Sequence, residues 1–162
     1  IQKGAKKMKI KNYDVEMSGY RPKLVVKETY DYEGKVAELN QPEKIARFCR
    51  NTLNLHKKLE EHMYMIGFTT KFNVVGVSEI GMGGRSYCHV DKKNIMTRLL
   101  LMGATCVALV HNHPSKNPNP SKDDLDTTAK IKKSCESMDI HLIDHIIIGG
   151  FRYYSFSEHD KL

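Results

Sequence analysis

The spacing of hydrophobic and polar residues divides the chain into short strands and helices. Runs rich in β-branched or aromatic residues, or with apolar residues at every second position, predict strands, whereas apolar residues three and four positions apart predict helices. The expected strands are 23–29, 61–68, 73–80, 85–90, 105–111, 140–149 and 152–157, and the expected helices are 42–55, 91–102 and 121–138. This order predicts an α/β (α+β) fold, with a single mixed β-sheet domain flanked by helices.

All three expected helices have recognisable starts. Pro42 suits a first turn, because its missing N–H would have no helical partner there. Asp91 is a favourable N-cap residue. Ser121 and Asp124 match a capping box, in which the serine side chain caps the helix and the acidic residue reaches back to it. A cap alone would account for both residues.

The positive charge of the chain is concentrated near its N-terminus. The net charge is +7, and residues 1–27 carry +6 of it, from eight lysines and arginines and two acidic residues. We therefore assign residues 1–40 to a basic N-terminal arm and leading strand, and residues 41–162 to the main domain. The arm is either a solvated tail or a candidate for weak contact with nucleic acid.

Composition favours a globular chain without membrane contact. Apolar residues make up 40% and charged residues 28% of the 162 positions. The longest apolar run, Leu99–Val110, is too short to span a bilayer, and no apolar segment follows the basic N-terminus as a signal peptide would require. The four cysteines form no CxxC pair, which argues against a zinc ribbon or a disulfide framework. We expect a cytoplasmic location, and the sequence leaves a homo-oligomer open.

A histidine pair offers the clearest chemistry. In "HNHPSKNPNPSKDD" (111–124), His111 and His113 end an apolar strand. Side chains repeat their direction every two residues along a strand, so both imidazoles should lie on one face and form half of a metal site. Asp123 and Asp124, in the next helix, are the candidates for a third ligand. The prolines between restrict the loop, and we expect them to hold the helix start against the strand end.

The spacing of these residues resembles a known motif. H-x-H, seven residues, S, two residues and D is similar to the JAMM motif of the JAB/MPN metalloprotease family, with His111, His113, Ser121 and Asp124 in the motif positions. The proline-rich loop and "IDHIIIGGFRYYSFSEHDKL" (143–162) resemble the RadC-like branch. The likeness covers about residues 45–162. It implies a JAB/MPN (cytidine-deaminase-like) sandwich and makes 41–162 a RadC-like JAB/MPN catalytic domain.

The resemblance also implies roles for individual residues. His111, His113 and Asp124 would ligate Zn²⁺ with a water as fourth ligand, and Ser121 would support the developing oxyanion. Glu61 would be the general base, because RadC-like sequences carry a glutamate at the start of this strand. The implied reaction is zinc-dependent hydrolysis of a peptide or isopeptide amide bond in a peptide or protein substrate.

Several alternatives remain open at this point. Glu79, near the far end of the hairpin, is the second candidate for the general base, and Asp123 is the second candidate for the third ligand. The chain is alternatively a DNA-repair-associated or nucleic-acid-binding RadC-like protein without hydrolase activity, or a scaffold without metal. An HNH nuclease is disfavoured, because that fold spreads its three residues over a ββα unit.

Three further residues bear on the comparison with the family. Lys116 stands where RadC-like proteins usually carry glycine, and we expect it to constrain the turn and place a cation beside the site entrance. Asp144 resembles a fixed feature of the branch, which we interpret as structural. We interpret His145 as a strand histidine held by a hydrogen bond in the core.

Overall fold

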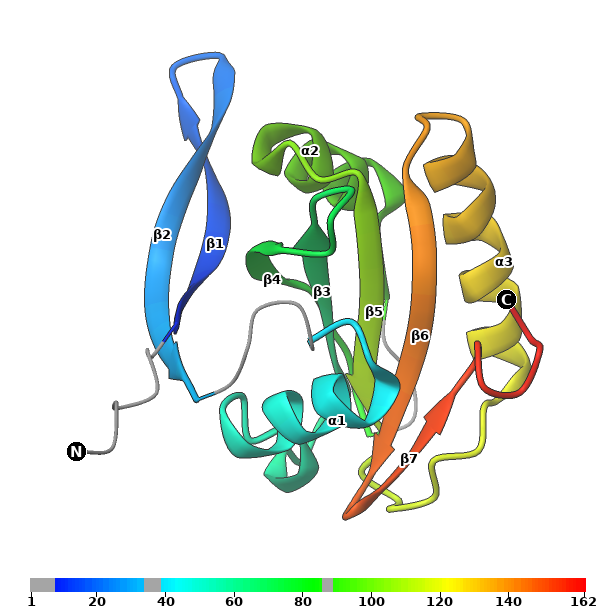
Figure 1. Cartoon of the computed structure of the whole chain (residues 1–162). Helices are drawn as coiled ribbons and strands as arrows, with labels where there is room; N and C mark the ends of the chain where they lie inside the picture. Colours follow the sequence, from blue (N-terminus) through cyan, green and yellow to red (C-terminus); the bar gives the residue numbers. More distant parts are fainter. Residues whose placement is uncertain (1–7, 34–38, 86–88) are drawn as a thin grey trace.

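The computed structural model describes residues 8–33, 39–85 and 89–162. Within these ranges, seven strands form one mixed sheet in the order β2-β1-β4-β3-β5-β6-β7 (Figure 1). The elements are β1 (Met8–Ser18), β2 (Arg21–Tyr32), α1 (Pro42–Asn51), the 3₁₀ helix η2 (Leu55–Lys57), β3 (His62–Phe68), β4 (Val74–Met82), α2 (Lys92–Met102), β5 (Cys106–Asn112), α3 (Lys122–Glu136), β6 (His141–Gly149) and β7 (Arg152–Ser155). The expected α/β fold, a mixed sheet flanked by helices, is confirmed.

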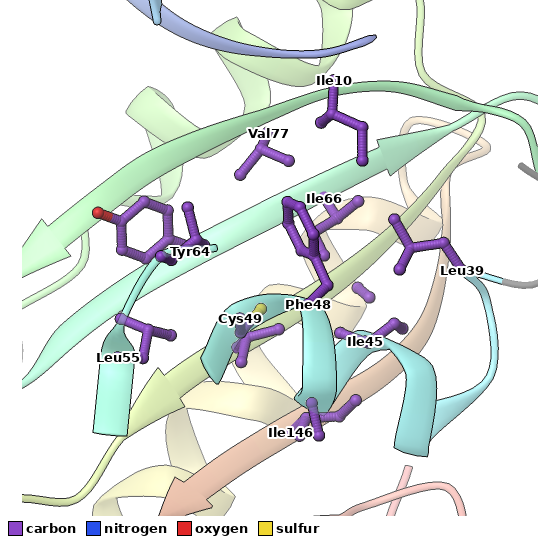
Figure 2. Close-up of a cluster of buried hydrophobic side chains, with 14 of the residues drawn as sticks. Ile10, Leu39, Ile45, Phe48, Cys49, Leu55, Tyr64, Ile66, Val77 and Ile146 are labelled. Atoms are coloured by element: carbon purple, nitrogen blue, oxygen red, sulfur yellow. The ribbon is translucent and has the colours of Figure 1, made fainter. Parts of the chain in front are cut away.

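One face of the sheet is covered by α1. Figure 2 shows Phe48 pointing from this helix toward Ile66 of β3, within a cluster that extends to Ile10 of β1 and Ile146 of β6. Phe48 is 2% exposed, and its ring meets that of Tyr32 edge-on at a centroid distance of 5.9 Å. This cluster therefore joins the N-terminal hairpin to the C-terminal half of the sheet.

The opposite face of the sheet is covered by α2 and α3. Its core combines Met63 and Met65 of β3 and Leu109 of β5 with Leu99 of α2 and Ile131 of α3. Because β5 alternates its side chains between the two faces, His111 continues the row of Leu109 on this face. The sheet therefore presents the first histidine of the motif toward the start of α3.

The strand directions bring the motif segments together at one end of the central strands β3 and β5. β5 and β6 are parallel and are joined through α3, whereas β3 runs antiparallel to β5. The C-terminal end of β5 consequently lies beside the N-terminal start of β3, with Met63 opposite His111 in the register. Residue 61, the loop after β5 and the first turn of α3 meet at these strand ends.

The N-terminal region differs from its expectation. Residues 8–18, which we assigned to a basic arm, form β1 and pair with β2 as a long antiparallel hairpin at one end of the sheet (Figure 1). Ile10 is 1% exposed and belongs to the α1-side core, while Lys9 and Lys11 are exposed. The basic residues before Met8 lie outside the described residues. We did not predict this strand, because the charged residues around Ile10 masked the alternation of buried and exposed positions.

Smaller differences concern element ends. The helix expected over 42–55 ends at Asn51 and is followed by η2. Of the strand expected at 85–90, residues 86–88 lie outside the described residues, and Arg85, His89 and Val90 are not in a strand. Cys49, Cys106 and Cys135 are buried and free. No helix in the described ranges combines the length and the apolar character needed to cross a bilayer.

Candidate metal centre

Three side chains converge where β5 ends and α3 begins. The Nε2 atoms of His111 and His113 lie 3.0 Å apart. Oδ1 of Asp124 lies 3.1 Å from Nε2 of His111, and Oδ2 lies 3.3 Å from Nε2 of His113. The sequence predicted that both histidines share a face and that α3 supplies a carboxylate, and the structure brings these three residues together.

The spacing of these atoms suits a metal ion. Ligands of a tetrahedral ion with bonds of about 2.0–2.1 Å lie roughly 3.3–3.4 Å from one another. The observed separations of 3.0–3.3 Å are slightly smaller, so a small outward shift would complete the geometry. Two imidazoles and one carboxylate leave a fourth tetrahedral position without a protein ligand from this group. The residues present therefore fit a divalent metal centre.

The second nitrogen of each imidazole has its own partner. Nδ1 of His113 lies 2.8 Å from the backbone oxygen of Asn117. A carbonyl oxygen only accepts, so this nitrogen carries a proton, and Nε2 is the nitrogen that can bind a metal ion. Nδ1 of His111 lies 2.8 Å from Nε2 of His145, which is itself fully buried. His145 is thus hydrogen-bonded in the core, as we expected, but its partner is a candidate metal ligand.

Burial and mutual charge shift the protonation of the cluster. Burial lowers the pKa of His111 below its usual value and that of His145 well below it. Burial acts on His113 in the same direction, but the Asp124 carboxylate outweighs it and raises the His113 pKa. Burial opposes charge on Asp124, yet hydrogen bonds from both histidines hold its pKa far below its usual range. Burial raises the pKa of Glu61, and the Asp124 charge adds to this effect.

Asp124 and Ser121 also form the helix cap. Oγ of Ser121 accepts from the Asp124 backbone N–H at 3.1 Å, and the Ser121 backbone N–H donates to Oδ2 of Asp124 at 2.7 Å, which completes a capping box. The Ser121 hydroxyl donates to the same Oδ2 at 2.7 Å. The cap predicted from the sequence therefore also orients the carboxylate toward the histidines.

Glu61 lies just before β3, and Asn112 holds the backbone on either side of it. The Asn112 side chain accepts from the His62 backbone N–H at 2.8 Å and donates to the Glu60 backbone oxygen at 3.0 Å. Asn112 is 1% exposed and sits between the two histidines of the motif. The middle residue of HNH is thus a clamp that fixes the segment carrying Glu61 to the strand that carries the histidines.

Glu79 lies away from this cluster. It pairs with Nδ1 of His62 at 2.5 Å and stands opposite Tyr64 in the β3–β4 register. Tyr64 belongs to the α1-side core, whereas the histidine pair lies toward α2 and α3. Glu61, in contrast, lines the same hollow as His113 and Asp124. Of the two candidates for a general base, only Glu61 is placed beside the candidate metal ligands.

The hollow beside the cluster has a volume of about 320 Å³. Its walls include Glu61, Arg85, His113, Ser121, Asp123 and Asp124. Asp123 lines it without belonging to the group of potential ligands, so Asp124 rather than Asp123 takes the third position.

Comparison with known proteins identifies the family. Residues 39–162 match the RadC-like JAB domain. The chain belongs to the RadC-like JAB domain family. Similar curated proteins carry the name UPF0758: one from Carboxydothermus hydrogenoformans is 36% identical over 76% of this chain and 53% of the relative. One from Streptococcus agalactiae is 32% identical over 92% and 64%, and one from Clostridium perfringens is 34% identical over 79% and 58%. The chain thus spans about half to two thirds of these relatives.

The backbone of the loop after β5 explains why RadC-like proteins usually carry glycine at the position of Lys116. Lys116 has φ +65°, a conformation that favours glycine. Its side chain lies against Gly150, and it is not among the described residues that line the hollow, so the cation expected at the site entrance is directed elsewhere. A Cβ at Gly149 would lie 2.5 Å from the Pro118 nitrogen, so the proline loop seats directly on the end of β6.

Sequence reasoning missed part of the site of this RadC-like JAB domain. Asn112 and Asn117 were not singled out, because neither a side chain that binds the backbone nor a backbone carbonyl acceptor has a residue pattern of its own. Asp144 behaves as expected: its carboxylate accepts from the Ser155 hydroxyl at 2.6 Å and from the Ser157 backbone N–H at 3.0 Å. It fixes the C-terminal turn rather than contacting the candidate metal ligands.

Proposed function

We propose that this RadC-like JAB domain is a zinc-dependent hydrolase that cleaves a peptide or isopeptide amide bond. The observation that supports it most strongly is the convergence of His111, His113 and Asp124 beside Glu61 in one hollow. Zinc accepts histidine and carboxylate ligands in tetrahedral sites, and catalytic zinc sites keep one position open. Zinc would supply Lewis acidity, which lowers the pKa of water to about 7 and polarises a carbonyl group.

Residues beside the open fourth position of the zinc site would transfer the proton and stabilise the developing charge. The Glu61 carboxylate would take a proton from the attacking water and deliver it to the leaving amine. Asn112 would keep Glu61 in place through the backbone on both sides. The Ser121 hydroxyl, which donates to Asp124 in this structure, would turn toward the substrate oxygen to stabilise its developing negative charge.

Zinc binding is the first test. Elemental analysis should find one zinc per chain in the wild type, and zinc should raise the melting temperature of metal-free protein because it binds only the folded state. His113→Ala should lose both effects. Asp123→Asn is the matched control, since Asp123 adjoins Asp124 in the same helical turn. A wild type that neither contains zinc nor is stabilised by it would contradict the proposal.

Hydrolysis is the second test. Zinc-loaded protein should be incubated with peptide and isopeptide libraries, and new termini detected by mass spectrometry. Glu61→Gln should keep zinc and lose cleavage by about 10²–10⁴-fold, because a general base is worth that much. Glu79→Gln should retain cleavage, since Glu79 lies on the other face. Equal loss in both variants, or none in Glu61→Gln, would refute the role of Glu61.

Nucleic-acid binding is the alternative proposal for the function. A cytoplasmic location is also proposed, and it is compatible with either function. The β1–β2 hairpin carries exposed lysines, among them Lys9, which pairs with Asp31 at 2.8 Å. DNA binding that weakens steeply with salt and disappears when the exposed Lys9 and Lys11 are replaced by glutamine, together with absent cleavage, would favour this alternative. Binding that is insensitive to salt would disfavour it.

A further inference from the structure

The second neighbours of the histidine pair form a continuous chain of hydrogen bonds. Nδ1 of His111 lies 2.8 Å from Nε2 of His145, and Nδ1 of His145 lies 2.6 Å from Oγ1 of Thr128. Oγ1 of Thr128 also lies 2.6 Å from the backbone oxygen of Asp124. The chain connects β5, β6 and α3, and it begins and ends at candidate metal ligands.

The direction of this chain follows from its last member. The Asp124 backbone oxygen can only accept, so at 2.6 Å it takes the single hydroxyl proton of Thr128. Thr128 then has only lone pairs to offer, and Nδ1–H of His145 must be the donor to it. Nε2 of His145 is left as an acceptor, and Nδ1–H of His111 donates to it. The reverse direction would place two acceptors 2.6 Å apart.

We infer that Thr128 and His145 are positioning residues that hold the His111 proton on Nδ1, so that Nε2 is the nitrogen presented to a metal ion. His113 needs no such chain, because the Asn117 carbonyl settles its tautomer directly. His111 depends on it, because an imidazole is a possible donor as well as an acceptor toward another imidazole. The inference rests on the proposed zinc site, because without a cation the Asp124 carboxylate, 3.1 Å from Nε2 of His111, favours a proton on that nitrogen as well.

Burial protects this chain of hydrogen bonds from water. His111 and His145 are 0% exposed and Thr128 is 2% exposed, so water does not compete for these bonds. The His145 ring is also stacked on Phe156, with centroids 4.8 Å apart and planes 17° apart. His145 therefore has one orientation, and the choice of tautomer is the remaining freedom.

The test substitutes the residue that sets the direction. Thr128→Val keeps the shape of the side chain and removes the hydroxyl, whereas Thr128→Ser keeps the hydroxyl. His141→Gln, on the same strand as His145 but exposed, is the control for a histidine outside the chain. Urea unfolding should first establish that each variant is folded. Zinc affinity is measured by competition with a chromophoric chelator, and the protonated nitrogen of His111 by nitrogen NMR of zinc-bound protein.

In the zinc-bound wild type, His111 should carry its proton on Nδ1 and bind the metal through Nε2. Thr128→Val should bind zinc about 10–100-fold more weakly, as expected when a partner that orients a ligand is lost. Thr128→Ser and His141→Gln should match the wild type in both measurements. Zinc bound through Nδ1 of His111 in the wild type, or Thr128→Val with wild-type affinity, would overturn the inference. A wild type that binds no zinc would instead refute the proposed function.

Discussion

Replacing Asn112 with alanine should destabilise the protein more than its small loss of volume suggests. The side chain makes two hydrogen bonds, to the His62 backbone N–H at 2.8 Å and to the Glu60 backbone oxygen at 3.0 Å. Asn112 is 1% exposed, so in Asn112→Ala the His62 N–H remains buried without this acceptor. An unsatisfied buried polar group costs about 1–3 kcal/mol, and the second lost bond adds about 0.5–1.5 kcal/mol.

The total loss should therefore be about 1.5–4.5 kcal/mol. For a chain of this size, each kcal/mol lowers the melting temperature by roughly 2–4 °C, so calorimetry and urea unfolding should both detect the change. Asn119→Ala, in the exposed loop after β5, is the matched control and should change stability by less than about 0.5 kcal/mol. If Asn112→Ala were as stable as Asn119→Ala, water would be replacing the clamp, and the reasoning from burial would be refuted.

Three further predictions concern the loop and the helix that follow β5. Ser121→Ala should lose about 1 kcal/mol of unfolding free energy and Ser121→Gly only a few tenths, because glycine is tolerated at an N-cap and alanine is not; equal stabilities in urea unfolding would contradict the capping role. Gly149→Ala should lower zinc affinity and stability together, since its Cβ would lie 2.5 Å from the Pro118 nitrogen and displace the loop that holds His113; unchanged chelator competition would refute this coupling. Lys116→Gly should stabilise the protein by up to about 1 kcal/mol by relieving a φ of +65°, whereas Lys116→Ala keeps the strain; an equal gain in both variants would assign the effect to the side chain instead.

The sequence predicted the elements around the site better than those at the N-terminus. The strand predicted at 105–111 is buried throughout, and the helix after Ser121 begins with a capping box, so the local signals agree with the tertiary structure. β1 was missed because Lys9, Lys11 and Asp14 are consistent with a solvated arm, and only pairing with β2 reveals that Ile10 is buried. Its burial depends on residues far along the chain, which no local pattern records.

The candidate site shows the same division. His111, His113 and Asp124 were predicted because direction along a strand and a helix cap are local properties. The partners that orient them were not predicted, because His145 comes from β6 and is brought to β5 by the parallel pairing of the two strands. The choice between Glu61 and Glu79 likewise required the register of β3 and β4, which decides the face on which each side chain lies.

The attachment of the β1–β2 hairpin has a consequence for how the molecule opens. In the described residues, β1 pairs with β4 at Asn12 and Val77. Two side-chain contacts also connect the hairpin to the rest of the domain: the Ser78 hydroxyl donates to the Tyr13 backbone oxygen, and Arg98 pairs with Asp14. Because Ile10 and Tyr32 also pack in the α1-side core, release of the hairpin would expose part of that core, and the amide protons of the hairpin should exchange before those of β3, β5 and β6.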